Sequence, residues 1–274
     1  MTPPVTPGSA DPFANYYAEQ SLSESTLIRF SSTRDAVLRV LRHAGLADSR
    51  LQVADVGCGA GTQAILWARD GHRVHGIDVN ETLVGLARKR AAEAGLDIRF
   101  DCASAVKLPW QSGSMDVCLL PELLEHVADW QTCLSEAVRV LKPRGLLYLS
   151  TTNRLCPVQQ EFDLPMYAWY PGWLKRRYEK LAVTTRPELV NHAKFPAVNW
   201  FDFYGLRRAP ALRGFRCLDR FDVAALGEHR MPARALLTAI RILPPLRWLA
   251  HAATSYTVIF AVGGQAGASH GAQA

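Results

Sequence analysis

One short run constrains what this chain can fold into more than any other part of it. The apolar segment Val53–Val56 leads directly into Gly57, Gly59 and Gly61, three glycines at alternate positions. Glycine allows the backbone to turn sharply and to approach a ligand where a Cβ atom would clash. A helix that begins near residue 62 would offer free N–H groups at the same place. The run therefore predicts a strand, a tight loop and a helix that together cradle a nucleotide.

An aspartate further along the chain narrows the type of nucleotide. A second apolar strand, expected over residues 73–77, is followed by Asp78, and a carboxylate in this place accepts hydrogen bonds from ribose hydroxyls. A dinucleotide fingerprint, G-x-G-x-x-G, would put its third glycine at position 62, which is Thr62 here. The spacing therefore favours a ribose-containing cofactor other than a dinucleotide. A glycine turn in an ordinary α/β domain is the alternative.

Strands and helices alternate through the first half of the chain. The hydrophobic spacing predicts strands over 51–56, 73–77, 97–101, 115–120 and 145–151, and helices over 22–44, 62–70, 81–94 and 129–140. A helix over 201–213 and two last strands over 215–222 and 254–262 follow. This order predicts an α/β fold, a Rossmann-like and mostly parallel seven-stranded sheet with helices on both faces and helical cap insertions.

Composition divides the chain into five parts. We expect a flexible N-terminal segment over 1–21, a cofactor-binding core over 22–152, a cap insertion over 153–200, the C-terminal part of the core over 201–263, and a disordered tail over 264–274. The cap is rich in proline and aromatic residues, which predicts a small helical core of its own over the mouth of the site. The six cysteines form no C-x-x-C pair, which favours reduced thiols in the cytoplasm over disulfides or zinc.

Positive charge is concentrated in the C-terminal part. Residues 172–251 hold fifteen Lys or Arg against six Asp or Glu, within a net charge of +6. Such a surface attracts lipid headgroups, phosphate or an acidic substrate. Nucleic acid is disfavoured, because this region carries no nucleic-acid-binding motif. The basic apolar insertion 226–251 contains a segment, 231–251, that either lies on a membrane surface or packs its apolar face on the domain.

The order of motifs resembles that of class I S-adenosylmethionine-dependent methyltransferases. Val53–Gly61 and Asp78 are similar to the first motif and to the ribose-binding acid of that family, and Leu141–Gly145 is similar to a later turn, with Arg144 where glycine is usual. Glu122–His126 and Ser150–Arg154 are most similar to the ubiquinone-biosynthesis O-methyltransferases. The resemblance implies S-adenosylmethionine as cofactor and methylation of a small or lipid-linked hydroxyl acceptor.

The resemblance also implies which residues bind the cofactor. Gly57, Gly59 and Gly61 would lie beneath its methionine and ribose portions, and Asp78 would accept from the ribose hydroxyls. Asp55 would order the loop or meet the ammonium group of the cofactor, and Arg29 would either grip its carboxylate or be simply an exposed helix residue. Val79, Ser104 and Ala105 would lie beside the adenine. The carbonyls of Leu120 and Pro121 would face the cofactor. Ser104 stands where the family often has an aspartate.

Glu122, Glu125 and His126 are the candidates for chemistry on the acceptor. At the start of a helix, positions i, i+3 and i+4 share one face, and two carboxylates with an imidazole there suit Mg²⁺. A bound cation would lower the pKa of a substrate oxygen. In two alternatives the residues only brace the helix, or His126 alone acts as the catalytic base. Methyl transfer itself mainly requires alignment of donor and acceptor, so no catalytic triad is expected.

Three rival functions remain open from the sequence. The acceptor could be a glycan sugar or a secondary metabolite, methylated on oxygen or nitrogen. The chain could instead be an inactive cofactor-binding partner subunit, although its complete glycine loop and Asp78 argue against that. A nucleic-acid methyltransferase is disfavoured, since the chain has no D/N-P-P-Y element. The sequence does not indicate an oligomeric state.

Overall fold

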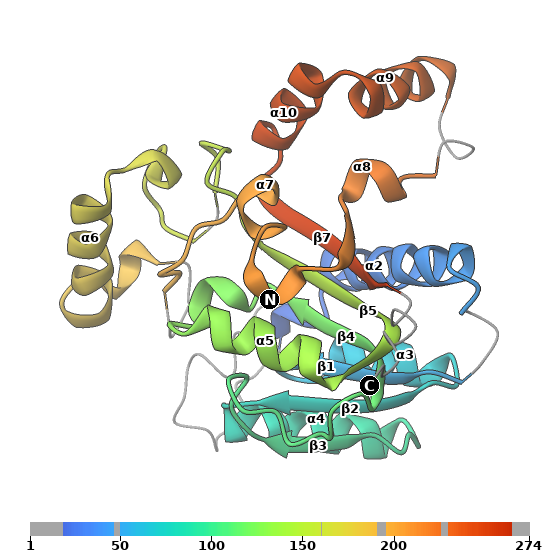
Figure 1. The fold of residues 1–274 in the computed structure, drawn as a ribbon. Helices are drawn as coiled ribbons and strands as arrows, with labels where there is room; N and C mark the ends of the chain where they lie inside the picture. The colour runs from blue at the N-terminus through green and yellow to red at the C-terminus, as the bar shows by residue number, and fades with distance from the viewer. Residues whose placement is uncertain (1–18, 47–49, 160, 191–195, 226–229, 265–274) are drawn as a thin grey trace, which may run out of the picture.

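A computed structural model describes residues 19–46, 50–159, 161–190, 196–225 and 230–264, so the two chain ends expected to be flexible lie largely outside the described residues (Figure 1). Its strands are β1 Gln52–Val56, β2 Arg73–Asp78, β3 Arg99–Cys102, β4 Met115–Pro121, β5 Leu141–Thr152, β6 Phe215–Leu218 and β7 Tyr256–Gly263. They form one seven-stranded sheet in the order β3-β2-β1-β4-β5-β7-β6. β1 to β5 pair in parallel and β7 runs antiparallel to both of its neighbours, which confirms the Rossmann-like, mostly parallel sheet.

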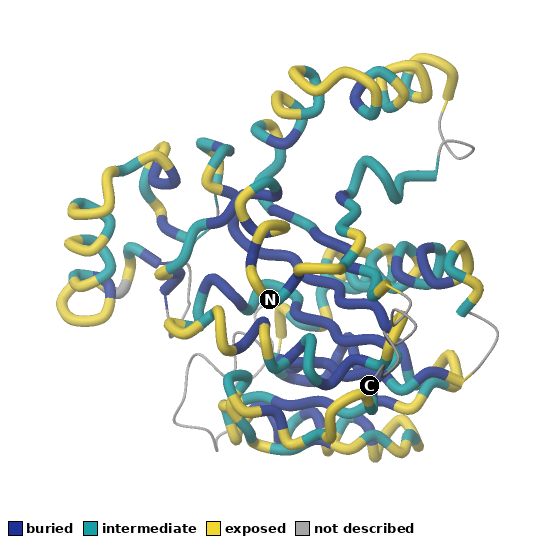
Figure 2. The backbone as a smooth tube through the Cα atoms, in the orientation of Figure 1, coloured by how far each residue is buried: buried dark blue, intermediate teal, exposed yellow. Residues whose placement is uncertain are grey.

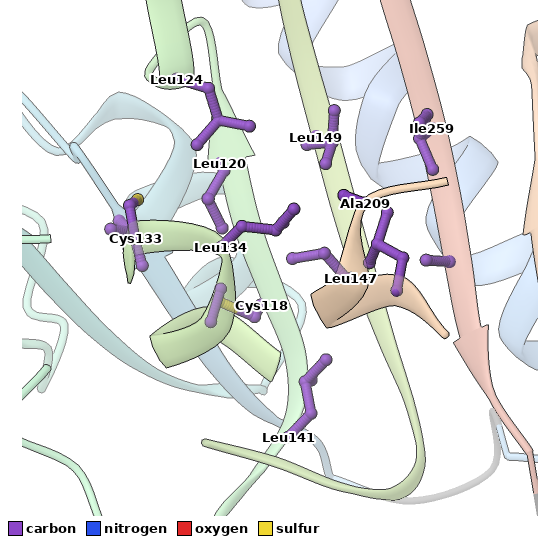
Figure 3. Close-up of a cluster of buried hydrophobic side chains, with 14 of the residues drawn as sticks. Cys118, Leu120, Leu124, Cys133, Leu134, Leu141, Leu147, Leu149, Ala209 and Ile259 are labelled. Atoms are coloured by element: carbon purple, nitrogen blue, oxygen red, sulfur yellow. The ribbon is translucent and has the colours of Figure 1, made fainter. Parts of the chain in front are cut away.

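Helices cover both faces of this sheet. One face carries α2 Glu24–His43, α3 Thr62–Arg69 and α4 Glu81–Glu93, which share one apolar cluster with the strands. The other face carries α5 Trp130–Val140, the short α7 Phe203–Leu206 and the 3₁₀ turn Pro210–Leu212. In Figure 3, Leu134 of α5 lies against Leu147 of β5. Both side chains are fully buried, so this layer holds α5 against the strands that lead to the site.

Polar side chains cap the helices whose starts were expected. Ser23 accepts a hydrogen bond from the Thr26 amide at the start of α2, and Asn80 accepts one from the Leu83 amide at the start of α4. Asp129 does the same for Thr132 at the start of α5. Each cap satisfies an amide that has no partner within its own helix.

The segment after residue 200 differs from the expectation in two places. The helix expected over 201–213 is broken into α7 and the Pro210–Leu212 turn, because Pro210 has no N–H to donate and disfavours a helical residue before it. The strand expected over 215–222 ends at Leu218. Asp219 accepts from the Phe221 and Asp222 amides there and starts the short helix α8, Arg220–Val223.

The cap insertion contains the 3₁₀ turn Tyr167–Trp169, helix α6 Gly172–Thr184 and the 3₁₀ turn Pro187–Leu189. Phe162 and Tyr167 stack with ring centroids 4.0 Å apart and form a small core with Ala182 and Val190. The basic apolar insertion forms α9 Met231–Ile242 and α10 Pro244–Ala252, which stand away from the sheet in Figures 1 and 2. Among the described residues, no helix has the length and apolar character needed to cross a membrane.

Candidate active site

The glycine loop lies between β1 and α3 and is held against the end of β2. The amides of Gly57 and Cys58 donate to the Ile77 carbonyl at 2.8 and 2.9 Å. Gly57, Gly59 and Gly61 have φ angles of +77°, +49° and +79°, a region that favours glycine. A Cβ atom on Gly61 would lie 2.8 Å from the Ala87 Cβ, whereas one on Gly59 would meet nothing within 4 Å. The loop is thus packed tightly at Gly61 and open at Gly59.

The Asp78 carboxylate is fixed in place by two backbone amides. Its Oδ2 accepts from Gly59 N at 2.9 Å, and its Oδ1 accepts from Asn80 N at 2.8 Å. Each carboxylate oxygen has a further lone pair. The side chain is half-buried beside the open part of the loop, so it can accept hydrogen bonds from a diol without first reorganising.

Asp55 lies at the end of β1, beneath the same loop, and is fully buried. Burial raises its pKa to about 7, the nearby Asp78 charge adds to the rise, and the Ala64 amide opposes it. Within the described part of the chain, neither Asp55 oxygen has a hydrogen-bond partner. A buried carboxyl group without a partner is costly unless a polar or cationic ligand meets it. Asp55 therefore fits a cofactor that brings such a group.

The other positions expected near the cofactor follow the carboxyl ends of neighbouring strands. Val79, after β2, is 62% exposed, and Leu120 and Pro121 end β4. Ser104 and Ala105 follow β3, where the Ser104 hydroxyl accepts from the Val106 amide at 3.4 Å. Parallel strands bring these ends to one edge of the sheet, where ligands bind in open α/β folds.

Arg29 and Glu122 lie together, and this changes the expected role of Glu122. Glu122 has φ +51°, its amide donates to the Ser150 carbonyl at 2.8 Å, and its carboxylate forms an ion pair with Arg29. The expected helix start is a 3₁₀ turn, Leu124–His126, which begins after Glu122. The spacing that would put Glu122 on one helical face with Glu125 is therefore absent.

A different carboxylate completes the cluster. Glu125, His126 and Glu161 each offer a ligand atom, and these atoms lie within 4.8 Å of one another. Glu161 comes from the cap insertion, and its Oε2 lies 3.9 Å from His126 Nε2. The sequence grouped Glu122 with Glu125 and His126, whereas the structure brings Glu161 of the cap to these two residues and leaves Glu122 with Arg29.

Both carboxyl groups of this cluster are strongly perturbed. Glu125 is fully buried, and desolvation followed by the Glu161 charge raises its pKa to about 8. Thr151 donates to Glu125 Oε2 at 2.8 Å, which opposes the rise, whereas Oε1 has no partner among the described residues. Burial also raises the pKa of Glu161 to about 7. Near neutral pH the cluster can therefore exchange a proton or accept a cation at little further desolvation cost.

Asn199 holds the turn that carries Glu125 and His126. Its side-chain amide donates to the carbonyls of Leu124 at 3.0 Å and Val127 at 2.7 Å. Its backbone carbonyl accepts from Thr152 Oγ1 at 3.0 Å. Its backbone amide donates to the Glu125 carbonyl at 3.2 Å. Neither Glu161 nor Asn199 was predicted from the sequence, because each lies far along the chain from the turn and no local spacing connects them.

Comparison with known proteins agrees with this geometry. Residues 54–149 match the methyltransferase domain family. A ubiquinone biosynthesis O-methyltransferase of Maricaulis maris is 31% identical over 206 residues, which cover 70% of this chain and 79% of that protein. One from Brucella anthropi is 35% identical over 152 residues, 52% of this chain and 57% of that protein. The chain therefore matches little more than half the length of the second relative.

Solved structures show the same fold at lower identity. A putative sarcosine dimethylglycine methyltransferase from Galdieria sulphuraria is 17% identical with a TM-score of 0.54, covering 92% of this chain and 98% of that one. Phosphoethanolamine N-methyltransferase 2 of Haemonchus contortus, solved with S-adenosyl-L-methionine, is 15% identical with a TM-score of 0.52, covering 92% and 60%. The chain is thus an S-adenosylmethionine-dependent methyltransferase and belongs to the family of the ubiquinone biosynthesis O-methyltransferases.

Proposed function

We propose that this enzyme methylates a hydroxyl oxygen of a small or lipid-linked acceptor. The observation that carries the proposal is the cluster of the buried Glu125 with the half-buried His126 and Glu161 beside the glycine loop. Leu123, directly before the turn that carries Glu125 and His126, lies against the glycine loop: its Cδ1 would be 3.0 Å from a Cβ atom on Gly57. A hydroxyl acceptor must lose a proton on methylation, and this cluster offers groups able to take it.

The chain's own residues hold the methyl donor in this proposal. Asp78 accepts the ribose hydroxyls, the open side of Gly59 leaves room for the ligand, and the unpaired Asp55 carboxyl faces its cationic end. When bound, S-adenosylmethionine would supply a methyl group on a sulfonium, whose sulfur leaves as a neutral thioether. The protein's remaining task is to place the acceptor oxygen in line and to remove its proton.

A divalent cation is a second part of the proposal, and Mg²⁺ is the candidate. The candidate ligand set is Glu125, His126 and Glu161, two carboxylates and an imidazole. The unpartnered Oε1 of Glu125 supports it, because a buried carboxylate oxygen without a hydrogen bond is an available ligand. Such a cation would lower the pKa of the acceptor hydroxyl. Without a cation, His126 would act as the base and Glu161 would orient it.

The test uses methyl-labelled S-adenosylmethionine and cell extract, separated into organic and aqueous phases, with and without a chelator. Label in the organic phase that disappears with chelator supports a lipid-linked acceptor and a metal-assisted reaction. Glu161→Gln should remove the chelator-sensitive part of turnover, while Glu122→Gln, the matched control, should keep it. Chelator-insensitive label in the aqueous phase would contradict both parts and favour a glycan or metabolite. Cofactor binding without any label would favour an inactive partner subunit.

Contact of residues 231–251 with a membrane also forms part of the proposal. A lipid-linked acceptor resides in a bilayer, so an enzyme that uses one gains from a peripheral membrane contact.

A further inference from the structure

Helices α9 and α10, with the flanking residue Arg230, form an arm over residues 230–252 whose apolar side chains face outward. The described residues include fifteen exposed large apolar side chains, and six of them lie on this arm, between 48% and 72% exposed. They are Met231, Leu236, Ile242, Leu243, Trp248 and Leu249. A surface helix of a globular protein normally turns its apolar side inward. Figure 2 shows the exposed stretches along both helices.

Three polar side chains of the arm, Arg241, Arg247 and His251, face inward. Arg241 donates to the carbonyls of Phe221 at 2.8 Å and Ala224 at 2.6 Å. Arg247 pairs with Asp219 and Asp222 at 2.7 and 2.5 Å, and His251, also buried, lies 2.8 Å from Asp219 Oδ2. These contacts fasten the arm to α8 through its charged groups. Large apolar side chains of the arm are thus exposed while three of its charged or titratable groups are turned toward the rest of the protein.

The charge of the arm fits an anionic partner. Residues 230–252 contain no Asp or Glu, and Arg230 and Arg234 are exposed. Met231, Arg234 and Ile242 lie along one face of α9 that borders an open hollow. A two-fold contact between copies would set this face against itself, with arginines and no acidic residue on either side. Anionic headgroups above an apolar layer match both properties at once.

We infer that the arm is a docking surface for a lipid bilayer that contains anionic phospholipid. Its six exposed apolar side chains enter the interfacial region, with Trp248 at headgroup depth, and Arg230 and Arg234 contact the phosphates. The break at Pro244 sets α9 and α10 as two short helices that follow the surface rather than cross it.

The arm also orients the catalytic edge of the sheet. Asn153, at the end of β5, donates through its side chain to the carbonyls of His251 at 2.8 Å and Thr254 at 2.7 Å, where α10 ends. Docking through the arm therefore turns the carboxyl end of β5, beside the candidate site, toward the bilayer. This inference rests on the membrane contact named in the proposed function, and only its link to acceptor supply depends on the lipid-linked acceptor.

Co-sedimentation of the full chain with vesicles tests the inference. Vesicles of equimolar phosphatidylglycerol and phosphatidylcholine should bind the protein, and pure phosphatidylcholine vesicles should bind it much less, with salt weakening the difference. Trp248→Ala should lower the partition coefficient about tenfold through lost apolar burial. Arg234→Glu should lower it by about tenfold or more, because the substitution reverses a charge at an anionic surface.

Two matched variants serve as controls. Trp173→Ala removes a tryptophan of α6 that is more exposed than Trp248, 63% against 48%, and Arg73→Glu makes the same charge reversal at the start of β2. Both variants should bind vesicles as the wild type does. Unchanged cofactor affinity in all four variants shows that each is folded. Binding indifferent to phosphatidylglycerol, or equal losses in arm and control variants, would overturn the inference. The inference would also be overturned if sedimentation velocity showed that the wild type is a dimer and that Trp248→Ala is a monomer, because the arm would then be a contact between copies. If the protein binds the vesicles but the methyl label appears in the aqueous phase, the docking surface stands and only the proposed lipid-linked acceptor is wrong.

Discussion

Two aspartates at adjacent strand ends differ in how they are held, and the proposed cofactor site uses both. Asp78 already has two amide donors and is fixed before any ligand arrives. Asp55 is buried, has no partner among the described residues, and carries a raised pKa. In the proposed site, Asp78 supplies a rigid acceptor for hydroxyls, and Asp55 supplies a charge that forms fully only when a cation faces it. The difference comes from burial, since both are strand-end carboxyl groups.

Asp78→Ala should weaken S-adenosylmethionine binding by at least ~1.5 kcal/mol, roughly a tenfold rise in Kd, because two charge-assisted hydrogen bonds are lost. Isothermal titration calorimetry measures the change. Asp70→Asn, which removes a carboxylate at the far end of α3, is the control and should bind as the wild type does. Equal affinity in Asp78→Ala and wild type would contradict the assignment of the ribose site.

Asp55 should make the stability of the cofactor-free enzyme depend on pH. Folding raises its pKa from 3.8 to about 7, so the folded state binds the proton more tightly than the unfolded state. The free energy of unfolding should therefore fall as pH rises from about 4 to about 7, by up to about 4 kcal/mol, and change no further above that. Asp55→Asn should remove this contribution.

Urea unfolding of both proteins across this pH range provides the measurement. The stability difference between Asp55→Asn and wild type isolates Asp55, because Glu125 and Glu161 titrate in both proteins. A difference that stays constant with pH would show that Asp55 does not carry the raised pKa.

At the scale of elements, the candidate site depends on a cap that folds around its own aromatic core. Tyr167 is fully buried, stacks on Phe162 and lies near Trp200. The same insertion supplies Glu161 to the cluster on the Leu124–His126 turn, and its last residues hold that turn through Asn199. The cap is therefore a structural part of the proposed acceptor site, whereas the glycine loop belongs to the sheet.

Tyr167→Ala should cost the cap about 3–5 kcal/mol of local stability, because a large buried ring is replaced by a cavity. Hydrogen exchange should speed up across residues 162–190 while protection of β1 and β4 persists. Turnover should fall and cofactor affinity should hold. Trp173→Ala, on the exposed side of α6 in the same insertion, should change none of these. Global loss of protection in Tyr167→Ala would mean that cap and sheet unfold as one unit.

At the scale of the whole molecule, the last strand completes the sheet. β7 lies between β5 and β6 and pairs antiparallel with both, from Tyr256 to Gly263. Without it, β6 would have no neighbour in the sheet and the β5 edge would be open. The last strand in the chain is therefore an interior strand of the sheet, and β6, which precedes it, is an edge strand.

A chain that stops at Thr254 should fail to fold and bind no cofactor, whereas one that stops at Gly264 should keep the affinity of the full chain. The reason is that the first protein lacks β7, whereas the second lacks only residues 265–274. Circular dichroism and cofactor titration of both proteins measure this. A folded, cofactor-binding protein ending at Thr254 would show that β1 to β5 suffice.

Local patterns determined much of this molecule. The alternate glycines and the alternation of apolar segments predicted the tight loop after β1 and the Rossmann-like sheet, because these features depend on neighbours within a few residues. One local prediction was wrong: the helix expected over 201–213 is interrupted before Pro210, which has no N–H to donate. Arg144 takes φ +68°, so it keeps the turn that glycine usually makes.

Only the tertiary structure decided which carboxylates meet. Helical spacing grouped Glu122 with Glu125, but the turn begins too late, and Glu122 pairs with Arg29 instead. Glu161 joins the cluster across a long stretch of chain, and no spacing rule describes such a contact. Likewise, the sequence of residues 231–251 was compatible with a segment on a membrane surface and with one packed on the domain. In the structure, Arg241 donates to backbone carbonyls of α8, and Arg247 pairs with the aspartates at its start. Contacts between distant segments depend on how whole elements pack, which local sequence does not encode.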